Sequence, residues 1–256
     1  MSAKSAGRAS KRPRSEKNLA FWLASFVVVP FMKICAHFEW IDGDKVPATG
    51  AFVLAPNHYS NLDPIVISYA LWKFNRVPRF LAKASLFDIP VIGRALHALG
   101  QIPLERPNAA VFGDATAMAA ARDLVEKGRA VIVYPEGTLT RDPDLWPMRG
   151  KNGAVRLALQ HDLPLIPVVH WGTQTVMPRY KNSLHIFPRK TITIKYGDPV
   201  DLSEYRGRPL NAKMLNEATV KLMAAITELL ESVRGEKAPH TPWNPRRHDQ
   251  NETGKF

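Results

Sequence analysis

The sequence has few of the residues that cross-link small domains or bind metals through sulfur. Cys35 is the single cysteine among 256 residues, which excludes an internal disulfide and a thiolate-cluster metal site. His-Glu-x-x-His, Walker and Gly-x-Ser-x-Gly patterns are also lacking, so no zinc-protease helix, P-loop or serine nucleophile elbow is expected. We therefore expect chemistry that needs no metal, no cofactor and no covalent intermediate on a serine.

The N-terminal apolar run is shorter than the roughly 20 residues that a membrane-spanning helix needs. It covers residues 19–32, follows a basic segment and ends at Lys33. A secretory signal is disfavoured because no small-x-small cleavage site follows. We predict that residues 18–37 form an uncleaved anchor of interfacial helices, divided at Pro30 and with Trp22 at the headgroup level. The alternative is an N-terminal helix buried against the domain.

Acidic residues are outnumbered, with 23 Asp and Glu against 35 Lys and Arg and a net charge of +12. This excess predicts an anionic partner, either nucleic acid, an acidic membrane or a phosphorylated substrate. Residues 1–17 carry six of the cations and should form a disordered basic arm that contacts anionic lipid. A nucleic-acid-binding protein should place basic and aromatic residues together on one face, whereas here the N-terminal arm holds much of the excess positive charge. We therefore expect an anionic membrane surface, and no nucleic acid, as partner.

Apolar strand patterns alternate with helical patterns from residue 38 onward. This alternation predicts one α/β domain over residues 38–235, with a mixed, largely parallel sheet covered by helices. Residues 236–256 contain three prolines and are predicted to be a flexible tail. Strands are expected at residues 38–41, 51–55, 80–82, 101–104, 130–134, 165–169 and 191–196, and helices at 65–74, 91–99, 109–126, 151–160 and 211–234.

His58 and Asp63 lie in a polar turn between the buried strand at 51–55 and a helix that Pro64 begins. An extended chain would hold them roughly 16 Å apart, and a continuous helix would point them away from each other. Only a tight turn brings them together. A carboxylate that accepts from one imidazole nitrogen leaves the other nitrogen free as a base. We also expect Asp63 to be the helix N-cap; the alternative for His58 is a structural role, capping a backbone carbonyl.

The spacing of this pair is weak evidence by itself, because His37 and Asp42 repeat it. The residues between His37 and Asp42 alternate as in a strand, which should hold that pair apart. Local context therefore singles out His58 and Asp63.

A second apolar strand ends in the turn Pro135-Glu136-Gly137-Thr138. Ligands of such sheets bind outside the carboxyl ends of the strands. We therefore expect this turn and the one that holds His58 to line one crevice, with a plain surface turn as the alternative.

Several cations follow the ends of strands or turns. Each alone is an ordinary surface charge, but together they would make a phosphate site, with Arg offering paired hydrogen bonds and Lys a point charge. They are Lys83, Arg106, Arg141, Arg149 and Lys151.

Residues 57–63 resemble the first sequence block of the glycerolipid acyltransferases, and the chain is similar to bacterial 1-acylglycerol-3-phosphate acyltransferases in particular. One departure is Leu139, which stands where the third block usually has arginine; the nearest cation is Arg141. The further blocks match Lys83 to Phe87 with Pro90, Gly93, Gly100 and Arg106, then Glu136 to Thr140 with Lys151 and Gly153, and finally Ile166 to Val168.

The resemblance implies a glycerolipid acyltransferase fold and transfer of a fatty acyl group from acyl-CoA or acyl-carrier protein to the sn-2 hydroxyl of lysophosphatidic acid. It also implies a place on the cytoplasmic face of the cell membrane. His58 would be the general base and Asp63 would orient it, while N–H groups around Gly137 would hold the oxyanion and Glu136 the acceptor hydroxyls or the turn itself. The other substrate-binding residues would be the five cations, with Lys83 and Arg106 preferred for the phosphate, and Asn57, Ser60 and Thr138.

Alternatives stay open for the acceptor and for the loop at residues 140–150. The acceptor can be another lysophospholipid or a glycosylated inositol lipid, and a non-catalytic lipid-binding module is a more distant possibility. The loop is either a lid or acyl contact, or a well-packed surface loop. The sequence leaves acyl-chain length, the choice of donor and the oligomeric state undetermined.

Overall fold

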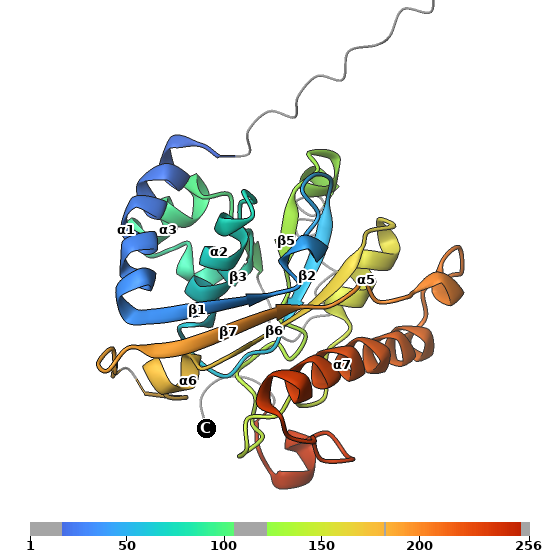
Figure 1. Ribbon diagram of the computed structural model, residues 1–256. Coiled ribbons are helices and arrows are strands. Elements are labelled where there is room, and N and C mark those ends of the chain that lie inside the picture. Colours follow the sequence, from blue (N-terminus) through green and yellow to red (C-terminus); the bar gives the residue numbers. More distant parts are fainter. Residues whose placement is uncertain (1–16, 105–121, 182, 252–256) are drawn as a thin grey trace, which may run out of the picture.

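The computed structural model describes residues 17–104, 122–181 and 183–251, and its helices cover both faces of a central sheet (Figure 1). The strands follow the order β1-β7-β6-β2-β5. Neighbouring strands are parallel, except that β6 and β7 are antiparallel. The prediction of a mixed, largely parallel sheet is therefore confirmed. The strands are β1 (Ala36–Ile41), β2 (Phe52–Pro56), β5 (Ala130–Ile132), β6 (Leu165–Trp171) and β7 (Lys190–Tyr196).

Strand β2 lies inside the sheet between β5 and β6, and every one of its residues is buried. Phe52 and Leu54 point into one hydrophobic cluster, whereas Val53 and Ala55 point into the other. This alternation is the period of a strand, and burial on both faces explains why the run is continuously apolar. The strand thereby delivers the following turn to the carboxyl edge of the sheet.

The helices form two layers. One layer holds α1 (Leu19–Cys35), α2 (Asp63–Lys73) and α3 (Pro90–Ala98), while α5 (Gly153–Gln160) and α7 (Ala212–Arg234) cover the other face (Figure 1). A short parallel pair, β3 (Leu81–Lys83) and β4 (Ile102–Leu104), forms a separate sheet. The one-turn helix α6 (Thr173–Val176) follows β6.

The predicted elements that fall within the described residues are confirmed, with ends displaced by at most two residues. Helix α7 begins after Asn211, whose side chain accepts from the N–H of Met214, and it ends at Gly235 with φ of 68°. Most of the helix predicted at 109–126 lies outside the described residues, and its described end, residues 122–126, is helical. Helix α6 was not predicted.

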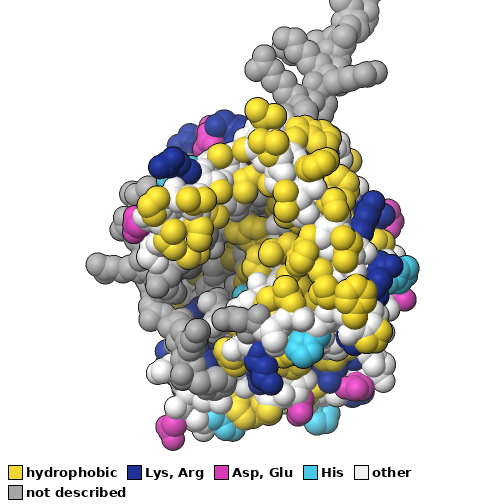
Figure 2. Space-filling model, turned by 90° about the vertical axis from the view of Figure 1, so that its left-hand side faces the viewer, with side chains coloured by type: hydrophobic (Ala, Val, Ile, Leu, Met, Phe, Trp, Pro, Cys, Tyr) yellow, Lys and Arg dark blue, Asp and Glu magenta, His cyan; other side chains and the backbone are white. Residues whose placement is uncertain are grey.

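The N-terminal segment differs from the divided anchor that the sequence predicted. Helix α1 runs without interruption through Pro30. Proline removes one intrahelical hydrogen bond, and the bonds on either side hold the helix together. One face packs against α2 and α3, with Phe21 and Met32 buried. The other face is exposed and apolar (Figure 2), and it carries Leu19, Trp22, Leu23, Phe26 and Val27.

The C-terminal segment also differs from the flexible tail that was expected. The N–H of Arg149 donates to the carbonyl of Trp243, and the Trp243 ring stacks on His248 with centroids 3.6 Å apart. Pro245 is buried at the start of a short 3-10 turn, Pro245–His248. The bond from Arg149 attaches the segment to the domain at Trp243. The basic arm, apart from Lys17, lies outside the described residues.

Candidate active site

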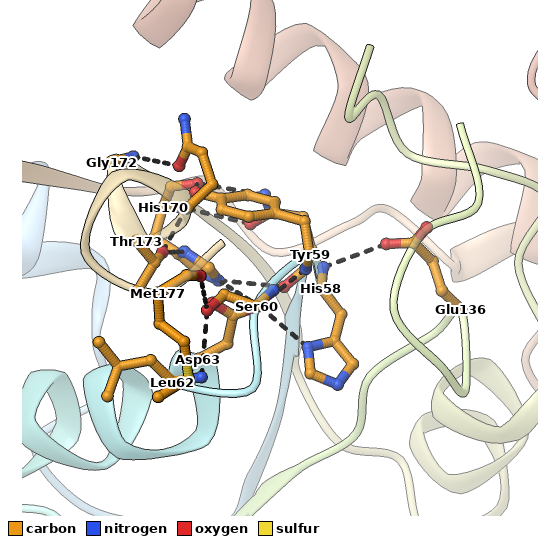
Figure 3. A network of polar contacts seen from close by, with 12 residues as sticks. His58, Tyr59, Ser60, Leu62, Asp63, Glu136, His170, Gly172, Thr173 and Met177 are labelled. Carbon is orange, nitrogen blue, oxygen red and sulfur yellow. Dashed lines mark hydrogen bonds and ion pairs between the residues drawn. The ribbon is translucent and has the colours of Figure 1, made fainter. Parts of the chain in front are cut away.

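His58 and Asp63 meet in the turn between β2 and α2 (Figure 3). Nδ1 of His58 lies 2.9 Å from Oδ2 of Asp63, and the same oxygen accepts the N–H groups of Tyr59 and Ser60, both at 2.8 Å. The Asp63 side chain is fully buried, whereas 16% of the His58 side chain is exposed. Among the described residues, none hydrogen-bonds to Nε2 of His58. The turn thus holds one imidazole nitrogen and leaves the other for a ligand.

Asp63 is not the N-cap that the sequence predicted. It is the first residue of α2, and Leu62 occupies the N-cap position. The carboxylate turns back toward the N–H groups of Tyr59 and Ser60, because the chain curls around it before the helix begins. It therefore shapes the turn that holds His58 rather than the end of the helix.

The charge of Asp63 is set by its neighbours. Burial by itself raises the pKa of this carboxyl, but the imidazoles of His170 and His58 and the N–H of Ser60 outweigh burial and lower the pKa. The result is an ionised carboxylate that receives hydrogen bonds on one oxygen. Such a group fixes the orientation of an imidazole and stabilises the imidazolium.

Glu136 approaches His58 from the turn after β5. Its Oε1 accepts the N–H of His58 at 3.1 Å, and its Oε2 accepts the N–H of Met148 at 3.0 Å. Only 1% of Glu136 is exposed, and burial raises its pKa to about 8. Of the two roles expected for Glu136, these contacts favour holding the turn.

The turn that follows Glu136 is tightly constrained. Gly137 has φ of 68°, and its N–H donates to the carbonyl of Tyr134 at 3.0 Å. The Lys151 side chain lies over Gly137, close enough that an added Cβ would be 3.1 Å from it. The N–H of Gly137 itself closes the turn, and the oxyanion role expected of the N–H groups around Gly137 stays a prediction.

Tyr134 joins the two turns. Its ring stacks on the His58 imidazole with centroids 4.1 Å apart and an interplanar angle of 27°. The Tyr134 ring also stacks on Phe80, with centroids 6.2 Å apart. The ring therefore limits the rotation of His58, a role that the sequence did not reveal.

Asn57 and Ser60 point into the protein. The Asn57 amide bonds to the backbone of His170, and the Ser60 hydroxyl donates to the carbonyl of Met177 at 2.7 Å and accepts the N–H of Leu62. Both residues are buried. The geometry favours a part in shaping the turn over the substrate contact that the sequence predicted.

The predicted cations are only partly brought together. Arg141 is 1% exposed, Arg149 lies on the surface, and Lys151 is half-buried beside Gly137. The side chain of Lys83 and all of Arg106 lie outside what the structure describes. The phosphate roles of these residues stay predictions, with Lys151 the best placed in the described region.

The loop at residues 140–150 is well packed, while its role as a lid or acyl contact stays a prediction. The Thr140 hydroxyl donates to the carbonyl of Trp146 at 2.7 Å. The guanidinium of Arg234 lies between two indole rings, 3.8 Å from the centroid of Trp146 and 4.4 Å from that of Trp171. Backbone bonds from Thr140 to His58 and from Lys151 to Pro135 fasten both ends of the loop to the site.

Sequence reasoning missed His170, which lies at the carboxyl end of β6 and is fully buried beside Asp63. Its Nε2 is 3.7 Å from Oδ2 of Asp63. His170 could have been found as a lone histidine directly after the apolar strand predicted at residues 165–169. The argument that polar groups gather at carboxyl ends of strands applies to it as well.

Comparisons with known proteins point to one family. The chloroplastic 1-acyl-sn-glycerol-3-phosphate acyltransferase of Brassica napus is 33% identical over 156 residues, 60% of this chain and 42% of that protein. The 1-acyl-sn-glycerol-3-phosphate acyltransferase of Haemophilus influenzae is 32% identical over 151 residues, 58% of each chain. This chain therefore spans less than two-thirds of the length of these two relatives.

A solved structure shares the fold. The 1-acyl-sn-glycerophosphate acyltransferase PlsC of Thermotoga maritima superposes with a TM-score of 0.58 and 19% identity, covering 84% of this chain and 83% of that one. A family model described as acyltransferase matches residues 37–171, which include His58, Asp63, Glu136 and His170. Because that match covers more than half of the chain, the protein belongs to the acyltransferase family.

Proposed function

We propose that this protein transfers a fatty acyl group from acyl-CoA or acyl-carrier protein to the sn-2 hydroxyl of 1-acyl-glycerol-3-phosphate, which makes phosphatidic acid. The observation that carries the proposal is the 2.9 Å contact between Nδ1 of His58 and Oδ2 of Asp63. The contact leaves Nε2 of His58 for a substrate. Relatives named as 1-acyl-sn-glycerol-3-phosphate acyltransferases support this choice of acceptor.

The reaction is a direct transfer between hydroxyl and thioester. Nε2 of His58 takes the proton of the acceptor hydroxyl as its oxygen bonds to the thioester carbon. Asp63, ionised and fixed at Nδ1, stabilises the imidazolium that forms. When the carbon–sulfur bond breaks, the leaving thiolate takes the proton from Nε2. The ester and the free thiol are released, and His58 is neutral again.

The acceptor phosphate is proposed to bind near the turn of Gly137. Lys151 lies over this turn, and Arg149 is exposed two residues before it. Both precede α5 and can reach an anionic group outside the strand ends. Lys83 and Arg106 remain proposed ligands from the matched second block.

A second acceptor is favoured by one observation. Leu139, 7% exposed, replaces the arginine usual at this position, and Arg141 is buried at 1%. Among the described residues, this turn therefore has fewer accessible cations, which would suit a lysophospholipid with a larger headgroup or a glycosylated inositol lipid. Comparing these acceptors with lysophosphatidic acid at equal concentration distinguishes the two proposals.

Membrane attachment through α1, on the cytoplasmic face, is part of the proposal. None of the helices in the described residues has the length and apolarity to cross a bilayer. Side chains on the outer face of α1 are nevertheless apolar and exposed, with Leu23 at 63% and Phe26 at 82%. Val91 on α3 is 81% exposed, and Figure 2 shows hydrophobic side chains gathered around a hollow on this side of the molecule. An interfacial helix buries such a face among lipid headgroups and acyl chains.

Vesicle sedimentation tests the attachment. Phe26→Glu should lower the fraction bound to phosphatidylcholine vesicles that contain phosphatidylglycerol. Val220→Glu is the matched control, because Val220 is 70% exposed on α7, in the opposite helix layer. Equal binding of both variants and the wild type would refute attachment through α1.

The function itself is tested by acyl transfer from palmitoyl-CoA to oleoyl-lysophosphatidic acid in mixed micelles. We expect activity in the wild type, a loss of about 100- to 10,000-fold in His58→Ala, and a rate within about 2-fold of the wild type in His37→Ala. His37 is the control because it is an exposed histidine on β1 with the same spacing to an aspartate. If folded His58→Ala keeps most of the rate, the assignment of the base is wrong. A wild type that acylates only other acceptors would contradict the proposed substrate alone.

A further inference from the structure

The backbone of His170 is hydrogen-bonded to the residues on both sides of His58. Its N–H donates to Oδ1 of Asn57 at 3.0 Å, and its carbonyl accepts from Nδ2 of Asn57 at 3.1 Å. The same carbonyl accepts the hydroxyl of Tyr59. The two neighbours of His58 in the sequence are thus both hydrogen-bonded to one residue of β6.

The His170 ring adds a third tie. Nε2 lies 3.1 Å from the carbonyl oxygen of Asn57 and 3.7 Å from Oδ2 of Asp63. Both of these atoms are acceptors, so Nε2 carries the proton. Nδ1 lies 2.8 Å from Oγ1 of Thr173, whose single hydroxyl hydrogen can be donated to Nδ1 or to the Tyr59 hydroxyl 3.3 Å away. When Thr173 makes the shorter contact, a neutral ring has a partner at each nitrogen.

Burial disfavours a positive charge on this ring. The His170 side chain is fully buried, and desolvation lowers its pKa even though the Asp63 carboxylate acts against this. The titratable groups that face it are Asp63 on α2, together with His58 and Tyr59 in the preceding turn. A positively charged His170 would compete with the His58 imidazolium for the Asp63 carboxylate, and its charge would oppose protonation of His58. A neutral N–H donor holds the turn without that competition.

We infer that His170 is a positioning residue: its backbone and its Nε2–H fix the turn that aims His58. The inference rests on the catalytic roles proposed for His58 and Asp63. It assigns a task to β6, a strand whose sequence block is otherwise an apolar core segment. A misplacement of about 1 Å at a catalytic group can cost about 100-fold in rate.

The matched variants are His170→Gln and His170→Asn. Both side chains are uncharged amides, but only Gln extends far enough to return an N–H to the position of Nε2. We expect kcat of His170→Gln to stay within about 3-fold of the wild type, and kcat of His170→Asn to fall about 10- to 100-fold. KM for both substrates should change less than about 3-fold in either variant.

Val169→Ala controls for lost stability. Val169 is adjacent to His170 on β6 and fully buried, but its side chain belongs to the hydrophobic cluster that includes residues of α5 and α7. It should lower Tm while leaving kcat per folded enzyme near the wild type. If kcat in the three variants follows Tm, or if Gln and Asn are equally active when folded, the inference is overturned.

A pH profile tests the charge of His170. If His170→Asn does not fold, Tyr59→Phe tests the positioning role instead. The acidic limb of kcat/KM should have the same midpoint and a single-proton slope in the wild type and in His170→Gln, which cannot ionise. A two-proton slope in the wild type alone would contradict a neutral His170. Tyr59→Phe removes the hydrogen bond from the Tyr59 hydroxyl to the carbonyl of His170 and should lower kcat about 2- to 5-fold at unchanged KM. An unchanged kcat would contradict the positioning role.

His58→Ala, assayed in parallel, separates the two levels of the argument. A collapse in His58→Ala with full activity in His170→Asn would reject only the positioning role. Retained activity in His58→Ala would reject the catalytic pair, and the positioning role with it.

Discussion

Two buried carboxylates flank His58, Asp63 from the turn before α2 and Glu136 from the turn after β5, and their ionisation differs. Asp63 gathers the N–H donors of Tyr59 and Ser60 and the His58 imidazole on one oxygen, and its pKa is lowered. Glu136 receives one backbone N–H on each oxygen, while burial, with the charge of Asp63 adding to it, raises its pKa to about 8. Equally buried, Asp63 is therefore ionised and Glu136 is mainly protonated and neutral at pH 7, because imidazoles and converging donors offset desolvation only at Asp63.

The largest expected effect of a substitution belongs to Asp63. Asp63→Asn keeps the size of the side chain but removes the charge and favours the wrong His58 tautomer, so kcat should fall about 1,000- to 10,000-fold. Steady-state acyl transfer measures it, with circular dichroism to establish the fold. Asp42→Asn, at the equivalent place after His37, should leave the rate unchanged. A loss below about 10-fold in Asp63→Asn would contradict the proposal that Asp63, unlike Glu136, acts as an ionised carboxylate.

Glu136 should make stability depend on pH. Its pKa rises from 4.5 in the unfolded chain to about 8 in the fold, so the folded state favours the protonated acid. This stabilisation is fully present below pH 4.5 and is lost as pH rises to 8. The shift of 3.5 units (8 minus 4.5) corresponds to at most roughly 5 kcal/mol. Urea unfolding of wild type and Glu136→Gln at pH 5 and pH 8 measures it, and the variant should lack this loss. Parallel pH curves for the two proteins would contradict the raised pKa.

Gly137 tests how strictly the second turn is built. Gly137→Ala puts a Cβ at φ of 68° and 3.1 Å from the Lys151 side chain, which should cost about 1–2 kcal/mol of unfolding free energy. Thermal unfolding measures this cost. Gly207→Ala is the control, because Gly207 has φ of 70° but open space around its Cα. Any excess cost at Gly137 reports the contact with Lys151, and equal costs would show that this contact is unimportant.

Tyr134, which links the two turns, should have the smallest effect. Tyr134→Leu removes the stacking on His58, an interaction worth about 0.5–1.5 kcal/mol, so kcat should fall about 2- to 10-fold. Tyr134→Phe keeps the ring and should retain most of the rate. If the Phe variant loses as much as the Leu variant, the hydroxyl rather than the stacking matters.

Much of the fold was predictable because local patterns agree with it. The apolar run of β2, the turn residues before Pro64 and the Asn211 and Gly235 caps of α7 each specify their own conformation. Helix α6 escaped prediction because a single turn gives too short a pattern to recognise. The unbroken course of α1 through Pro30 escaped because packing against α2 and α3 sustains a helix whose local signal suggests a break.

The pair His58 and Asp63 was predictable for the same local reason. His37 and Asp42 have the same spacing, but His37 lies on β1, whereas His58 and Asp63 are joined by a polar turn. By contrast, nothing near Arg141 in the sequence signals its burial, and nothing near Glu136 signals a contact with Met148. Those outcomes depend on segments that meet only in three dimensions.

The sequence by itself determined the order of the elements, the turn that pairs His58 with Asp63, and the family resemblance, because each depends on residues close together in the chain. Only the tertiary structure decided that Glu136 and His170, 78 and 112 residues further along than His58, bond to the turn that holds it. It also decided that two buried carboxylates carry different charges. Burial and convergent hydrogen bonding are properties of the assembled sheet edge, and no local pattern encodes them.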